Sequence, residues 1–151
     1  MGSEPREVEK VRERFGEALE EVVYFRGEDT LVVAPEKILE ICRFLKEDAE
    51  MGFELLVDVT GIHYLEREYS YEVVYHLLSL ARRRRLRLRV RLGEAGEIDS
   101  VTSVWRGADW HEREAFDLVG IRFKGHPDLR RILMPEDFEG HPLRKDFALE
   151  Q

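Results

Sequence analysis

The pattern between Leu86 and Leu92 limits the fold more than any other stretch of this chain. Apolar residues and arginines alternate there without a break, as LRLRVRL. Successive side chains of a β-strand point to opposite faces of its sheet, so one face of this strand is apolar and the other is positively charged. The apolar face needs a covering layer. The strand therefore predicts a sheet whose helices lie on one side.

The residues before this strand supply helices and further strands. Apolar residues at helical spacing predict helices over residues 4–15 and 36–50, with Pro35 in the first turn of the second one. Gly16 and Gly52 are the expected stops. Further β-prone or alternating runs predict strands over 19–26, 30–34, 53–64 and 71–80, with a turn at 27–29. The order αββαβββ predicts an α+β fold, a two-layer α/β sandwich with a mixed or mostly antiparallel sheet and helices on one face.

The strand expected over 53–64 has a predicted inner face. Alternation places four apolar residues on that face, namely Phe53, Leu55, Val57 and Val59. No long repeat or low-complexity tract interrupts this part of the chain.

A helical segment is expected after the sheet, over residues 99–120. Apolar residues recur at helical spacing from Val101 to Ala108, with Asp99 or Ser100 available as N-cap. A second helix is expected over 109–119, with Gly120 just beyond its end.

Three prolines follow Gly125 and predict irregular chain. We expect a single domain over residues 1–151. It would comprise a core at 1–98, the helical segment at 99–120, and an extended, partner-docking tail at 121–151.

Composition and charge exclude several classes of protein. The chain has 151 residues, a formal net charge of −8 and one cysteine, Cys42. The negative charge argues against non-specific nucleic-acid binding. A single thiol cannot hold an iron–sulfur cluster, and no run reaches the roughly 18 apolar residues of a transmembrane helix. We expect a soluble, cytoplasmic protein without a redox cofactor of its own.

Seven arginines lie between Arg82 and Arg91. They would form either a surface for anions or acidic partners, or a solvated sheet face paired with the many glutamates. Strand alternation explains half of the pattern without a ligand, so we favour the paired face or a protein partner over nucleic acid.

The five histidines do not have the spacing of a metal site. The residues are His63, His76, His111, His126 and His141. No pair stands one helical turn apart, as two ligands on a helix would. His126 and His141 each precede a proline and belong to turns. We expect these imidazoles to bond to backbone or carboxylate groups, and no metal.

Charged residues gather on the helix expected over 109–119. Glu112, Arg113, Glu114 and Asp117 have the spacing of helical neighbours. Paired carboxylates can perform acid/base chemistry, but the sequence has no adjacent nucleophile and no phosphate-binding loop. A partly desolvated ion-pair network is the favoured interpretation, with basic partners from the tail: Arg130, Arg131, Arg144 and Lys145.

These same residues carry a resemblance to a known family. The runs ERE at 112–114, AFDL at 115–118, GHPDLRRIL at 125–133 and PEDFEGHPLRKDF at 135–147 resemble, without gaps, the signature of the C subunit of NADH-quinone oxidoreductase. This is the complex I 30-kDa subunit family. The run SVTSVW at 100–105 is also similar, and the order αββαβββ agrees with the family fold.

The resemblance implies a non-redox scaffold in the peripheral arm of a respiratory complex. Such a protein would dock to the 49-kDa-type, hydrogenase-large-subunit-like chain that forms the quinone cavity, and would touch the iron–sulfur subunits. Iron–sulfur clusters, flavin and quinone would reside in those partners. The chain would be enzymatic only as part of an electron-transport translocase, on the cytoplasmic side of the membrane.

Two other functions stay open. One is the equivalent subunit of a membrane-bound hydrogenase, a formate-linked or a coenzyme F420-type dehydrogenase complex. Val119, where the family usually has an aromatic residue, and an end at Gln151, where many relatives continue, depart from the family pattern. The other is a stand-alone enzyme using Glu112, Glu114 and a histidine.

The residues expected to shape the tail or dock a partner all come from the matched stretch. They are Glu112, Arg113, Glu114, Asp117, Gly120, His126, Pro127, Asp128, Arg130, Arg131, Pro135, Asp137, His141, Pro142, Arg144, Lys145 and Asp146.

Overall fold

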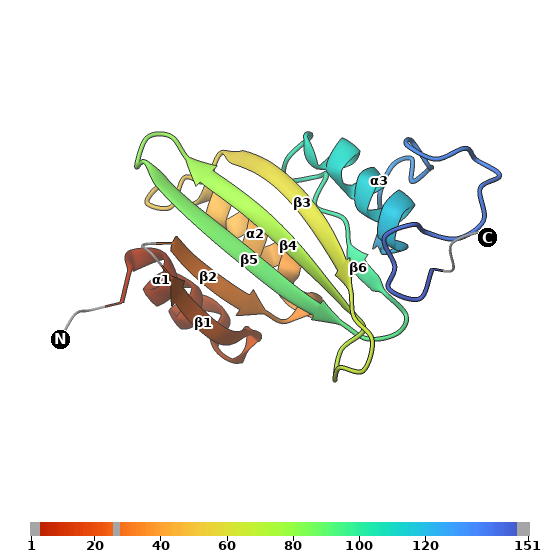
Figure 1. Cartoon of the computed structure of the whole chain (residues 1–151). Helices are drawn as coiled ribbons and strands as arrows, with labels where there is room; N and C mark the ends of the chain where they lie inside the picture. The colour runs from red at the N-terminus through yellow and green to blue at the C-terminus, as the bar shows by residue number, and fades with distance from the viewer. Residues whose placement is uncertain (1–3, 26–27, 148–151) are drawn as a thin grey trace.

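A five-stranded sheet is the centre of the fold (Figure 1). The structure is a computed structural model and describes residues 4–25 and 28–147. The strands lie in the order β1-β2-β5-β4-β3, and only β2 and β5 run parallel. Their bounds are β1 (Leu19–Phe25), β2 (Glu28–Val33), β3 (Leu55–His63), β4 (Tyr71–Ser79) and β5 (Arg84–Leu92). Of the expected turn at 27–29, Gly27 lies outside the described residues, and the other two positions belong to β2.

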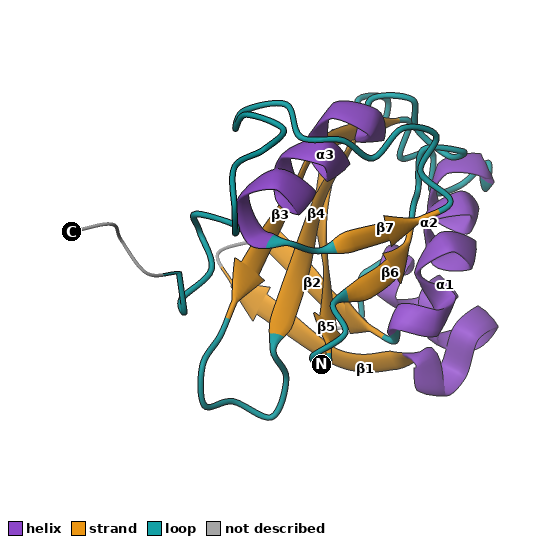
Figure 2. Ribbon diagram, turned by 90° about the vertical axis from the view of Figure 1, so that its right-hand side faces the viewer, coloured by secondary structure: helices purple, strands orange, loops and turns teal. Residues whose placement is uncertain are grey.

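Helices cover one face of the sheet and leave the other face bare (Figures 1 and 2). They are α1 (Arg6–Phe15), α2 (Ile38–Glu47) and α3 (Ala108–Val119). A short 3₁₀ turn follows α1 at Gly16–Ala18, and another precedes α2 at Pro35–Lys37. The predicted α+β sandwich with a mostly antiparallel sheet is confirmed. No helix in the described ranges is long and apolar enough to cross a membrane.

The second helix ends three residues earlier than the sequence predicts. Asp48 follows α2, and its carboxylate accepts the N–H groups of Glu50 (3.0 Å) and Met51 (3.1 Å). An aspartate that bonds to the backbone two or three residues ahead closes a turn instead of continuing a helix. The spacing of apolar residues up to Ala49 predicts a longer helix, because it gives no sign of this side-chain bond to the backbone.

The prediction for the inner face of β3 is wrong for two of its four residues, while Phe53, just before the strand, is buried as expected. Val59 is buried, but Leu55 and Val57 are 40% and 51% exposed. The pairing with β4 shifts between Leu56 and Asp58, which marks a β-bulge at Val57. One inserted residue reverses the alternation, so Leu55 points away from the helices.

The helix expected after an N-cap at Asp99 or Ser100 does not form, and a small second sheet flanks this segment in the chain. β6 (Glu97–Asp99) pairs in parallel with β7 (Arg122–Lys124), and Ile98 and Phe123 are buried. Residues 101–107 form turns and not a helix. Ser100 therefore caps no helix, and its hydroxyl accepts the N–H of Thr102 (3.1 Å) in a turn. The helix expected over 109–119 is confirmed as α3.

Gly61 on β3 fixes how closely α3 approaches the sheet. A Cβ at this position would lie 2.5 Å from Cδ1 of Ile121 and 3.6 Å from the Cβ atoms of Ala115 and Val119. Any larger side chain would push the helix outward. The end of α3, which carries the tail, is therefore positioned by the core.

The arginines of β5 follow the predicted alternation. Arg87, Arg89 and Arg91 lie on the bare face, and the apolar residues between them are buried beneath the helices. Arg87 pairs with Glu28 (3.0 Å) and Arg91 with Glu21 (3.4 Å). Pairing with glutamates, the favoured interpretation, is confirmed for these two residues.

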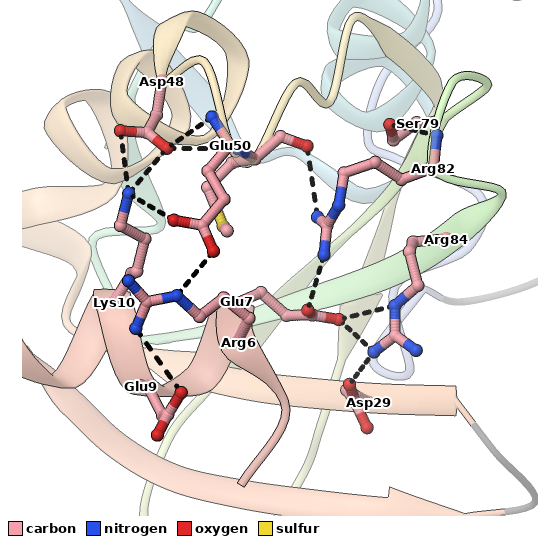
Figure 3. Close-up of polar contacts among 11 residues, drawn as sticks. Arg6, Glu7, Glu9, Lys10, Asp29, Asp48, Glu50, Ser79, Arg82 and Arg84 are labelled. Carbon is pink, nitrogen blue, oxygen red and sulfur yellow. Dashed lines mark hydrogen bonds and ion pairs between the residues drawn. The ribbon is translucent and has the colours of Figure 1, made fainter.

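A buried charge cluster ties α1 to the sheet (Figure 3). The side chain of Glu7 is fully buried and accepts a hydrogen bond from Nε of Arg84 (3.1 Å), while Arg84 also reaches Asp29 (3.1 Å). Arg82 lies 3.6 Å from the same glutamate. Burial raises the pKa of Glu7, but the Arg84 guanidinium outweighs it and holds that pKa below its ordinary value. Burial and the nearby Glu7 raise the pKa of Asp29.

Candidate partner-docking surface

Gly120 ends α3 and leaves space for the chain that follows. Residues 125–147 of that chain are called the tail. The φ of Gly120, +91°, lies in the left-handed region that favours glycine. Its N–H donates to the carbonyl of Phe116 (2.9 Å). A Cβ at this position would lie 2.9 Å from Cδ2 of His141. The tail therefore packs directly against the helix end.

The last carbonyl groups of α3 bond to the tail. Such groups have no partner inside a helix. The N–H of Leu143 donates to the carbonyl of Leu118 (2.6 Å). Nδ1 of His141 (2.9 Å) and Nη2 of Arg131 (3.0 Å) donate to the carbonyl of Asp117. The positive charge of Arg131 at this end is also favoured by the helix dipole.

The Asp117 carboxylate is the main attachment of the tail. It is fully buried, and its Oδ1 accepts Nε of Arg131 (2.6 Å). Its Oδ2 accepts the N–H groups of Ile132 (3.1 Å), Leu133 (2.6 Å) and Met134 (2.9 Å). Burial opposes ionisation, but these donors outweigh it and hold the pKa of Asp117 below its ordinary value. One carboxylate thus fixes three consecutive peptide groups.

Arg131 extends this attachment along the tail. Its guanidinium donates to the carbonyls of Phe138 (2.9 Å) and Gly140 (2.7 Å), and it lies over the ring of Phe138, 5.4 Å from the centroid. With Asp117, it joins the helix to two parts of the tail that are seven and nine residues further along the chain. Regular secondary structure contributes nothing here, so these bonds set the path of the chain.

The end of the tail attaches to the sheet. The N–H of Lys145 donates to Nδ1 of His63 (3.0 Å) at the end of β3. Arg144 pairs with Asp146 (2.7 Å) and lies over the ring of Tyr71, 5.8 Å from its centroid. Burial and then the nearby Arg144 lower the pKa of His63, which keeps its Nδ1 an acceptor.

Glu112 lies inside the molecule and bonds to the chain that precedes α3. Its Oε1 accepts the hydroxyl of Ser100 (2.6 Å), and its Oε2 accepts the N–H of Val101 (2.8 Å). Burial raises its pKa to about 7, against the lowering effect of those two donors. The Ser100 hydroxyl lies 2.9 Å from that of Thr102, so the hydroxyl pair can supply a donor or an acceptor to this carboxyl group.

The ion-pair network expected on α3 does not form as predicted. Arg113 does not pair with Asp117 but donates to the carbonyl of Arg130 (3.2 Å). Glu114 faces His111 at 3.7 Å. Among the four expected basic partners from the tail, Arg131 alone binds a carboxylate of this helix in the described structure.

The acid/base alternative fails on geometry. Glu112 has no exposed surface, so a substrate cannot reach it. Glu114 lies two residues further along the helix and faces elsewhere. The two carboxylates therefore do not share a site.

The turn histidines have the expected backbone contacts. Nδ1 of His126 accepts the N–H of Asp128 (2.9 Å), and its Nε2 donates to the carbonyl of Asp109 (3.2 Å). His141 bonds to the carbonyl of Asp117 at the end of α3. Within the described residues, no three His, Cys, Asp or Glu side chains are grouped to hold a metal ion.

The outer surface of the tail combines apolar and charged residues. Leu133 and Leu143 are 50% and 57% exposed, and Trp110 on the nearby helix is 52% exposed. Several residues expected to dock a partner are also exposed, namely Pro127, Asp128, Arg130, Pro135, Asp137, Lys145 and Asp146. Sequence reasoning missed the two leucines, because an apolar residue in irregular chain gives no sign of which way it points.

The comparisons with known proteins agree on one family. Residues 31–151 match the family described as "Respiratory-chain NADH dehydrogenase, 30 Kd subunit". This chain belongs to that family. A Rhizobium etli protein, a C subunit (numbered 2) of NADH-quinone oxidoreductase, is 53% identical over 92% of this chain and 74% of its own length. The C subunit of the Geotalea uraniireducens NADH-quinone oxidoreductase is 49% identical over 99% of this chain and 91% of its own length.

Solved structures show the same fold. A trypsin-resistant fragment of Nqo5 aligns with a TM-score of 0.70 and 33% identity, over 82% of this chain and 99% of the fragment. A chain of the archaeal membrane-bound sulfane sulfur reductase aligns with a TM-score of 0.78 and 24% identity, over 94% and 84% of the two chains. The second likeness concerns the fold alone.

Proposed function

We propose that this chain is the scaffold C subunit of a respiratory NADH-quinone oxidoreductase, which passes electrons from NADH to quinone. The observation that carries the proposal is the 53% identity to a C subunit of such an enzyme over 92% of the chain. The site geometry supports it, since the signature residues build a shaped surface and not a reaction centre.

The attachment of the tail favours docking. Binding costs less free energy when the contacting segment is already ordered. Asp117 and Arg131 hold the tail in one path while Leu133 and Leu143 stay exposed. Apolar side chains presented by an ordered segment are typical anchors of a protein interface. Side chains that hold the tail are therefore distinct from those that would contact a partner.

The proposed partner is the 49-kDa-type subunit that forms the quinone cavity, with neighbouring iron–sulfur subunits. The clusters, flavin and quinone would lie in those chains, and the present chain would hold none. The assembly would place it on the cytoplasmic side of the membrane.

The equivalent subunit of a hydrogenase-type complex is the second candidate. The fold shared with the sulfane sulfur reductase chain, at 24% identity, favours no particular electron donor. Genes neighbouring this one discriminate the two candidates: genes for NADH-oxidising flavin subunits would support the oxidoreductase, and hydrogenase genes in their place would contradict it.

Co-purification with the 49-kDa-type subunit tests the docking. We expect Leu133→Glu and Leu143→Glu to reduce recovery of the pair at least about tenfold, since each places a charge in an apolar contact. Tyr24→Glu is the matched control, because Tyr24 is 52% exposed on β1, away from the tail. Equal recovery of all three variants and the wild type would contradict docking through the tail.

A further inference from the structure

The bare face of the sheet has a cavity of about 350 Å³ at one end. Its lining includes Val57, Leu78 and Arg85, where β4 passes into β5. The tail contacts His63 and Tyr71, at the opposite ends of β3 and β4. The cavity is therefore separate from the surface that the tail forms, as the course of the strands in Figure 1 shows.

Two rows of side chains cross the bare face at this cavity. In the first, Leu55 lies opposite Leu78, which lies opposite Arg85. Residues directly opposite in antiparallel strands point to the same face. Val57, inserted by the bulge, is 51% exposed and lines the cavity, and Leu55 is 40% exposed. These residues form an apolar surface without a covering helix.

The second row is a closed hydrogen-bonded chain. Nε of Arg87 donates to Nε2 of His76 (3.2 Å), so Nδ1 of this histidine carries the proton and donates to Asp58 (2.5 Å). Arg87 also pairs with Glu28 (3.0 Å). Every member of the row has a partner within the chain. This row borders the apolar surface with polar side chains whose charges are paired within the chain.

Arg85 is the cavity-lining arginine that the described structure leaves without a carboxylate, since Arg83 and Arg89, which also have none, do not line the cavity. It is exposed on the cavity rim and pairs with no carboxylate among the described residues, whereas Arg84 and Arg87 both do. An arginine beside an apolar cavity is a site for a carboxylate supplied from outside, because guanidinium and carboxylate pair with fixed geometry.

The bulge decides how an occupant can approach. β3 is an edge strand of the sheet, and an edge can pair with an added strand. The insertion at Val57 interrupts the regular ladder of that edge. An occupant therefore lies on the face of the sheet and fills the cavity with a side chain.

We propose that this face binds a segment of a neighbouring subunit that presents a large apolar side chain next to a carboxylate. The apolar side chain enters the cavity against Val57 and Leu78, and the carboxylate pairs with Arg85. The proposal rests on the proposed function, because the partner is a subunit of the same complex. It adds a second contact surface at the other end of the molecule, so that this chain bridges two parts of the assembly.

Photo-crosslinking in the assembled oxidoreductase, purified from its native host through a tag on this chain, tests the proposal. A benzophenone amino acid replaces Val57, Leu133 or, as a control, Glu40, whose side chain is 58% exposed on α2. We expect the Val57 position to give an adduct with a peptide of another subunit that contains a large apolar residue beside Asp or Glu. The Glu40 position should give none.

Charge reversal provides the second measurement. Arg85→Glu should lower the yield of the Val57 adduct about tenfold, since it places like charges in contact. Arg122→Glu is the matched control, because Arg122 is an exposed arginine on β7, in the layer of helices. An unchanged yield with Arg85→Glu would refute the carboxylate contact.

The outcomes separate this proposal from the proposed function. An adduct at Leu133 with none at Val57 overturns the second surface and leaves the tail docking supported. An adduct between Val57 and a second copy of this chain also overturns it. If neither the Val57 nor the Leu133 position gives an adduct, the result contradicts docking through the tail as well.

Discussion

Replacing Asp117 with asparagine should release the tail without unfolding the sheet. The substitution preserves the size of the side chain and one carbonyl oxygen. If that oxygen takes the place of Oδ2, the amide nitrogen faces Nε of Arg131, which now lies 2.6 Å from Oδ1. Both groups are donors, so the strongest bond of the attachment becomes a repulsive contact.

The size of the effect follows from the four bonds. A hydrogen bond to a charged group contributes about 1.5–3 kcal/mol, and the three bonds from residues 132–134 weaken when their acceptor becomes neutral. Breaking a buried ion pair from one side costs about 3–5 kcal/mol. We expect about 3 kcal/mol, which raises the open population of the tail about 100-fold. The sheet keeps its own core, so this loss is local.

Hydrogen exchange measures that opening directly. The amide protons of Leu133 and Met134, which donate to Asp117, should exchange about 100-fold faster in Asp117→Asn, while those of β4 and β5 stay unchanged. Asp128→Asn is the control, since Asp128 pairs with Arg130 on the surface, at side-chain exposures of 49% and 62%. Equal loss of protection over the sheet, or no loss at the two tail amides, would refute an independently attached tail.

Three further predictions concern Glu7, Glu112 and Gly120. Glu7→Gln should cost about 2–4 kcal/mol in urea unfolding, because it removes the charge of the fully buried partner of Arg84. Glu50→Gln on the surface should cost less than about 1 kcal/mol. The pKa of Glu112 is raised from 4.5 to about 7, so between these pH values the folded chain binds more protons than the unfolded chain. The free energy of unfolding therefore falls by up to about 3 kcal/mol as the pH rises through this range. Glu112→Gln should remove that fall, as urea unfolding near pH 5 and pH 8 would show, and a fall that persists would contradict the assignment. Gly120→Ala should lower Tm, at a cost of about 1–3 kcal/mol from its φ of +91° and the ring of His141, whereas Gly93→Ala, with open space around it, should not.

The repeating patterns of apolar and polar residues predict most of the fold correctly. The alternation in β5 predicts its two faces correctly, because a half-buried strand selects side chains residue by residue. The order of the helices and strands and the class of the fold are predicted correctly for the same reason. Two of the errors arise where one residue interrupts a repeat. Asp48 ends α2 by a bond to the backbone, and the bulge at Val57 reverses the faces of β3.

The candidate site was predictable as a stretch but not as a set of bonds. Four cationic residues of the tail are candidate partners of Asp117 in the sequence, namely Arg130, Arg131, Arg144 and Lys145, and the structure shows that Arg131 pairs with it. The contact between Glu7 and Arg84 spans 77 residues, and no local pattern indicates such a pairing. Contacts of this kind depend on the assembled fold and not on periodicity.

The buried charges of this chain set positions more than they add stability. An apolar pair of the same volume could match the Asp117–Arg131 ion pair in free energy only if no other group were bonded to either side chain. It could not hold three consecutive peptide N–H groups and two distant carbonyls, since only directional bonds do so. The tail has no ladder of its own, so the placement of Leu133 depends on these bonds. Because Gly61 fixes α3 against β3, the core of the sheet ultimately determines where the proposed docking surface lies.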